Sequence, residues 1–210
     1  MFEQVTILLS FVYAIALTHL LSSAHELVLE RRRVRFSWLY ALWMLNALII
    51  LISNWLGFWD LHLIRQWTVG QILLQLSLAI VQYFTCSLLM IRPKDTGAID
   101  MVSLFEERRT AVACAFFAMW FVAMAMNYFD RDVLFAPQTS QWLLADAELL
   151  PASLFIGLAG WARPRWLQWL GGIGVFLVAV QFLVVGALGP TFGPKSVTAD
   201  DTHPPSAPAK

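Results

Sequence analysis

The feature that most constrains this chain is a succession of long apolar runs separated by short polar connections. A run of about 18 or more apolar residues is long enough to cross the hydrocarbon core of a bilayer as a helix. Lipid offers the backbone no hydrogen-bonding partner, so each spanning segment must satisfy its own amide and carbonyl groups. Strands of a membrane barrel alternate apolar and polar residues, and these runs do not. The sequence therefore predicts an all-α, polytopic membrane protein.

Six runs qualify, so we expect one transmembrane domain over residues 1–189, a bundle of six transmembrane helices. The predicted spans are 5–27, 36–58, 68–91, 109–129, 141–161 and 166–188. The fifth is the weakest because it holds Asp146, Glu148 and Pro151, and a re-entrant or tilted segment is its alternative. Residues 190–210 lack the apolar side chains that offset the entropy of ordering, which predicts a disordered tail.

Composition supports a membrane protein and excludes some partners. Charged residues make up 13% of the chain, against about 25% in soluble domains. The net charge is zero and no basic patch appears, so no nucleic-acid binding is expected. Glu3 stands where a cleaved signal peptide needs Lys or Arg, so we expect the first run to remain as a span. The expected surroundings are the lipid bilayer.

The connections predict an orientation. Those after the first, third and fifth spans hold ten Lys and Arg residues, whereas the even-numbered connections hold two. The positive-inside rule places the arginine-rich connections in the cytoplasm. Both termini are then periplasmic or extracellular, with the chain in the inner (plasma) membrane. Orientation alone explains the arginines of the first connection, with an attraction to anionic lipids of about 1 kcal/mol per residue.

The tryptophans are consistent with these boundaries, because indole rings favour the membrane interface. Trp120 lies in the middle of a predicted span. The other nine lie near predicted ends: Trp38, Trp43, Trp55, Trp59, Trp67, Trp142, Trp161, Trp166 and Trp169.

Polar groups inside spans are the candidates for function, since a charge at mid-bilayer costs about 2.5–3.5 kcal/mol on insertion scales. In the first span His19, Ser22, Ser23 and Glu26 share one helix face. A histidine and a carboxylate on one face suit proton relay or cation coordination. The alternative is that Glu26 lies at the headgroups and His19 bonds a neighbouring helix.

Uncharged amides follow in the next two spans. The second span holds Asn46 and Asn54, and the third holds Gln75 and Gln82. Amides in spans often bond helix to helix, and they also line wet paths. With no charge among them, bonding between helices is the favoured interpretation.

The later spans carry two acids and several small residues. Asp146 and Glu148 are two positions apart, so they point to different sides of a helix unless Pro151 breaks it. Two interpretations of these acids remain open: they line a transport path, or they lie in the outer headgroup zone. Small residues let helices approach closely, which predicts packing faces at Gly171, Gly172 and Gly174 and along the fourth span. That stripe is Ala111, Ala115, Ala118 and Ala125.

No catalytic motif is present, and Cys86 and Cys114 have neither disulfide nor metal-ligand spacing. Haem b needs a pair of histidines deep in the bundle, and only His19 qualifies, so no haem is expected. Because catalytic motifs and metal-ligand spacings are also missing, we expect no enzyme, metal or cofactor. The first functional hypothesis is a small ion channel or secondary transporter for protons or monovalent cations. Its candidate path residues are His19, Glu26, Gln75, Asp146 and Glu148.

Two further hypotheses remain open. One is a non-enzymatic accessory, scaffold or signalling protein that binds another membrane protein or forms a homo-oligomer. The other is a membrane enzyme acting on a lipid or quinone, which would have to combine acids and arginines predicted on opposite sides of the membrane.

Overall fold

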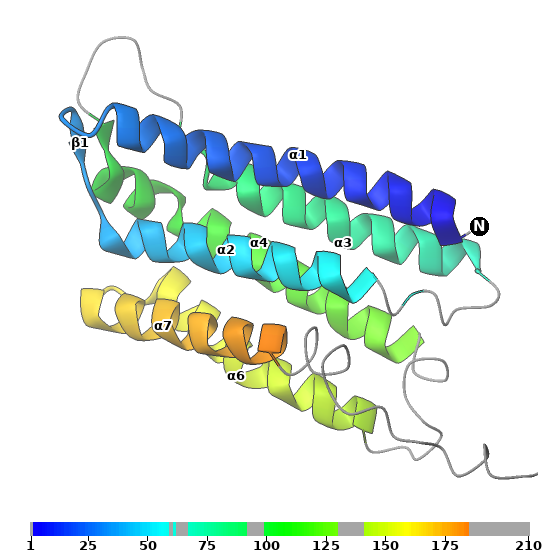
Figure 1. Ribbon diagram of the computed structural model, residues 1–210. Coiled ribbons are helices and arrows are strands. Elements are labelled where there is room, and N and C mark those ends of the chain that lie inside the picture. The colour runs from blue at the N-terminus through cyan, green and yellow to red at the C-terminus, as the bar shows by residue number, and fades with distance from the viewer. Residues whose placement is uncertain (1, 59–60, 62–66, 92–98, 130–140, 185–210) are drawn as a thin grey trace, which may run out of the picture.

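The computed structural model describes residues 2–58, 61, 67–91, 99–129 and 141–184. Within them the chain forms six helices and two short strands (Figure 1). The helices are α1 (Phe2–Leu29), α2 (Trp38–Gly57), α3 (Val69–Leu88), α4 (Met101–Phe129), α6 (Gln141–Trp161) and α7 (Arg165–Gln181). The tail predicted at 190–210 lies outside the described residues.

The predicted all-α membrane bundle is confirmed. Helices α1, α2, α3, α4 and α7 are each long and apolar enough to cross a membrane. Helix α6 follows the weak fifth span, and only its shorter part Leu150–Trp161 is comparably apolar. Pro151 lies inside α6 without ending it, as neighbouring helices permit in membrane proteins.

Polar residues just outside the apolar runs set where the helices begin. The Ser37 hydroxyl accepts a hydrogen bond from the Tyr40 amide and caps α2. Thr68 and Gln71 form a reciprocal capping box at the start of α3. These side chains satisfy amide groups that have no partner within the first turn of a helix.

Helix α4 begins eight residues before the predicted span. Oδ1 of Asp100 accepts hydrogen bonds from the amides of Val102 at 2.9 Å and Ser103 at 3.4 Å, which caps this end. Desolvation raises the pKa of Asp100, but these two bonds and the nearby Arg35 guanidinium outweigh it and hold the pKa below its usual value. The charged residues at the start of α4 are therefore helical, not loop.

A small strand pair joins two connections that are far apart in sequence. β1 (Val34–Arg35) pairs in parallel with β2 (Ile99–Asp100). Nη1 of Arg35 also lies 3.3 Å from a carboxylate oxygen of Asp100. The pair places the α1–α2 and α3–α4 connections at one end of the bundle, here called the arginine-rich end.

The α6–α7 turn belongs to the same end. Nη1 of Arg109, near the start of α4, donates to the Ala162 carbonyl at 2.7 Å. Consecutive spans run in opposite directions, so the first, third and fifth connections are expected on the same side. These three connections do lie together at one end.

Helix α2 lies centrally and packs against α1, α3, α4 and α7, while α1 packs chiefly against α3 (Figure 1). Helices α6 and α7 approach so closely that a Cβ atom added at Gly171 would lie 2.5 Å from the Phe155 carbonyl oxygen. Gly174 faces the Phe155 ring in the same seam. The glycines of α7 therefore form the packing face that the sequence predicted.

The alanine stripe predicted for α4 is only partly turned towards other helices. Ala111 and Ala118 are exposed and Ala115 and Ala125 are half-buried, whereas Ala113 and Phe116 are buried. The Cβ atom of Ala113 lies where a side chain on Gly160 of α6 would have to go. The close contact of α4 with α6 is therefore made at Ala113, outside the predicted stripe.

The end of α3 is held by side chains from three other helices. Nη1 of Arg108 on α4 donates to the carbonyls of Leu88 at 3.2 Å and Met90 at 2.9 Å. The Tyr40 hydroxyl of α2 donates to the Leu89 carbonyl at 3.0 Å. Ser23 of α1 accepts from the Ile91 amide at 3.1 Å. These bonds satisfy backbone groups that the helix end leaves open.

Candidate functional site

The predicted polar face of α1 divides between two environments. Ser23 is buried and bonds the chain beyond α3, whereas Ser22 is exposed. His19 is half-buried, and its ring centroid lies 5.4 Å from that of Tyr83 on α3. Glu26 is half-buried, and its Oε2 atom is buried without a hydrogen-bond partner in the described part of the chain. The predicted face therefore does not form one cluster.

Gln75 of α3 is buried with 2% of its surface exposed. Its Nε2 group has no hydrogen-bond partner among the described residues. No described hydrogen bond joins it to His19 or Glu26, which are themselves about 10 Å apart along α1. The side chains of Asp146 and Glu148 on α6 lie outside the described residues. Of the predicted path residues whose side chains are described, Gln75 is buried and His19 and Glu26 are half-buried, and no described hydrogen bond joins any two of them.

A different set of polar side chains does connect across the core. Nδ2 of Asn54 on α2 donates to Oε1 of Gln82 on α3 at 3.2 Å. Nε2 of Gln82 donates in turn to the Ala47 carbonyl of α2 at 3.3 Å. Asn54 also lies beside the Tyr13 hydroxyl of α1, which finds no partner of suitable geometry among the described residues. These residues link α1, α2 and α3.

Further polar contacts join α2 to α7. Nδ2 of Asn46 donates to the Gly172 carbonyl of α7 at 3.0 Å. One turn earlier on α7, Nε2 of Gln168 donates to the Ala162 carbonyl at 3.1 Å, the same oxygen that Arg109 binds. Polar contacts therefore reach from the arginine-rich end towards the middle of the bundle.

Together these side chains are called the interior polar track. Its members are Tyr13, Asn46, Asn54, Gln82 and Gln168, together with Gln75, a buried amide two turns before Gln82 on α3 that has no described hydrogen bond to the others. The amides of the second and third spans could be identified from the sequence. Tyr13 and Gln168 could not, because an isolated tyrosine or glutamine in a span carries little signal. The available signal on α7 was that Gln168 lies one helical turn before Gly172, which belongs to the predicted packing face, so the two residues share one side of the helix.

Several track members leave hydrogen-bonding capacity unused. Oδ1 of Asn46, Oε1 of Gln168 and Nε2 of Gln75 are all buried without a partner among the described residues. An unpaired polar atom in an apolar medium costs about 1–3 kcal/mol. Buried water is the usual partner of such atoms. The track is therefore chemically suited to hold water or a small cation between the helices.

Neither a metal centre nor a recognised family accounts for this arrangement. In the described ranges, no group of three or more His, Cys, Asp or Glu side chains is placed to hold a metal ion. Cys86 is a buried free thiol and Cys114 is an exposed one. No protein-family model, curated protein or solved structure matches this chain.

Proposed function

We propose that this membrane protein transports protons or a monovalent cation along the interior polar track. The observation that carries the proposal is that buried Asn46, Gln75 and Gln168 each have a polar side-chain atom without a hydrogen-bond partner among the described residues. Lipid cannot satisfy these atoms. Water entering between the helices can, and a row of waters and amides is a route for a proton or a small ion.

The position of the track along the helices also supports this proposal. Asn46 and Asn54 are eight residues apart on α2, which separates them by about 12 Å along the axis of this helix. Gln168 extends the track to the arginine-rich end, and Gln75 extends it towards the other end of α3. The track has no formal charge, which favours a singly charged ion over a divalent one. His19 and Glu26 are the proposed proton-exchanging groups on α1.

A flux assay tests this function. The purified protein would be placed in liposomes with a pH-sensitive dye, and proton and potassium gradients imposed. We expect wild type to dissipate one of them, and Asn46→Leu and Gln75→Met to lose most of that flux. His19→Ala, Glu26→Gln and Asp146→Asn would show which titratable groups take part.

Ser77→Ala is the matched control, because this exposed side chain of α3 bonds only the Leu73 carbonyl of its own helix. It should leave flux unchanged. Each variant would be checked for helical content and elution volume, which separates loss of a path from loss of fold. Folded wild type without flux above empty liposomes would contradict transport and favour the non-enzymatic accessory function.

The proposed orientation places the arginine-rich end in the cytoplasm and both termini outside, in the inner membrane. A reporter enzyme that works only in the cytoplasm, fused after Lys210, should therefore be inactive. The same reporter inserted after Arg32 should be active. Activity of the C-terminal fusion would contradict this orientation.

A further inference from the structure

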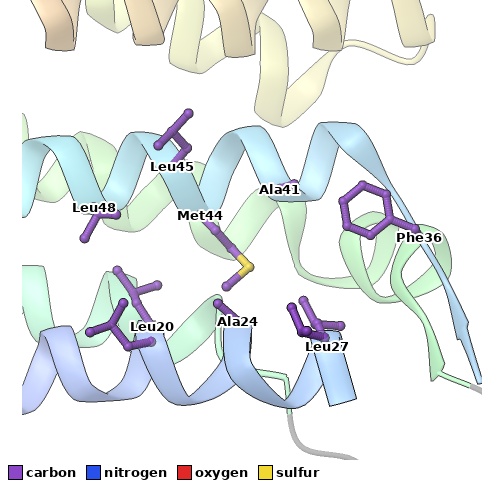
Figure 2. Close-up of a pocket in the computed structure, with 10 residues that line it drawn as sticks. Leu20, Ala24, Leu27, Phe36, Ala41, Met44, Leu45 and Leu48 are labelled. Carbon is purple, nitrogen blue, oxygen red and sulfur yellow. The ribbon is translucent and has the colours of Figure 1, made fainter. Parts of the chain in front are cut away.

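An apolar groove of about 310 Å³ lies between α1 and α2 at the arginine-rich end. Figure 2 shows Leu20, Ala24 and Leu27 of α1 pointing toward Met44 and Leu48 of α2. The groove exists because α1 packs chiefly against α3, leaving its α2 side partly unfilled where Ala24 and Ala41 are small. It does not include any member of the interior polar track.

The groove opens toward the lipid side of the bundle. Four of its lining residues, Leu21, Val28, Phe36 and Leu45, are exposed apolar side chains. A helix with its side chains is about 10 Å across, too wide for a space of this volume between two helices. A flexible hydrocarbon chain from the bilayer is thin enough to enter it.

The arginine-rich connection begins and ends beside this groove. Val28 and Phe36 both line it, and the arginine-rich connection runs between them in sequence. Arg33 is paired with Glu30 at 3.2 Å and Arg35 with Asp100 at 3.3 Å. Arg31 and Arg32 are exposed and form no ion pair with a described residue. Two exposed arginines without a described ion pair therefore belong to the connection that joins the two sides of the groove.

We propose that this groove binds an anionic glycerophospholipid, with one acyl chain between α1 and α2 and its phosphate at Arg31 and Arg32. Arginine binds phosphate in a bidentate manner. The site therefore matches a molecule that carries an apolar chain directly below a negative headgroup. The proposal is independent of transport, since the groove and the track share no residue.

Native mass spectrometry of the purified full chain provides the test. Phosphatidylglycerol and phosphatidylcholine with identical dioleoyl chains would be titrated separately, and the first bound lipid quantified. At about 1 kcal/mol for each arginine, phosphatidylglycerol should bind about 10- to 30-fold more tightly. The double variant Arg31→Gln/Arg32→Gln should bring the two affinities together.

The matched charge control is Arg163→Gln/Arg165→Gln, which removes two exposed arginines from the α6–α7 connection. It should keep the preference for phosphatidylglycerol. Equal affinity of wild type for the two lipids, or equal behaviour of the two double variants, would overturn the headgroup site. Because all four arginines are exposed, neither double variant depends on repacking the bundle.

A second pair of variants tests the groove itself. Ala24→Trp fills the slot, whereas Ala14→Trp adds the same ring to an exposed position of α1 outside it. Ala24→Trp should lose most of the phosphatidylglycerol binding, and Ala14→Trp should keep it. If both bind alike, the acyl chain is not in this groove. Oleic acid binding as tightly as phosphatidylglycerol would overturn a phospholipid as the occupant.

Discussion

Gly171→Ala is expected to destabilise the bundle by about 3 kcal/mol, at the upper end of the usual cost of overpacking. The new Cβ atom would lie 2.5 Å from the Phe155 carbonyl oxygen and 2.7 Å from the Ala159 amide nitrogen. Both are backbone atoms of α6, so no side-chain rotation relieves the contact and the two helices must move apart. The loss follows from the close approach of α6 and α7.

Gly157→Ala is the matched control, since it makes the same chemical change on the partner helix. There the new Cβ atom would lie 3.9 Å from the nearest atom, Cζ of Phe117, which is ordinary contact. Alanine is the better helix former by about 1 kcal/mol, so this variant should be neutral or slightly stabilising. Thermal unfolding in detergent, followed by circular dichroism, compares the two. Equal stability would mean that α6 and α7 do not pack through Gly171.

The Arg108→Met variant should lose a comparable amount, about 3 kcal/mol, because hydrogen bonds to charged groups contribute about 1.5–3 kcal/mol each. The Arg108 guanidinium binds the carbonyls of Leu88 and Met90. Both carbonyls belong to the end of α3, where a positive charge also interacts favourably with the helix dipole. Methionine keeps most of the side-chain length but leaves these oxygens without their donor.

Arg32→Met serves as the control because this arginine is exposed and has no ion pair with a described residue. A surface change of this kind usually shifts stability by about 0.5 kcal/mol or less. Hydrogen exchange of the peptide containing residues 85–91 should increase in Arg108→Met and not in Arg32→Met. Similar exchange and stability in both variants would show that Arg108 does not hold this helix end.

The apolar runs alone determined that this chain is a helical membrane protein, because a backbone in lipid must bond within itself. Helix α6 has the bounds predicted for the fifth span, and α2 and α3 lie inside the second and third. The start of α4 was not predicted, since hydropathy excludes the charged residues 106–109 that follow the first turn, which Asp100 caps. For the candidate site, the sequence identified the amides at Asn46, Asn54, Gln75 and Gln82 as interior groups.

Which face of each helix turns inward was decided only by the tertiary structure. Trp43, assigned to the interface from its position near a span end, is buried with its ring centroid 5.0 Å from that of Phe116. Two alanines of the α4 stripe, Ala111 and Ala118, face outward, although the composition of the stripe suits a seam. In a bilayer both the core and the surroundings are apolar, so apolar residues do not reveal their side. Close contacts of particular residues, such as the backbone of Gly171 with α6 and the side chain of Asn46 with α7, selected the packing.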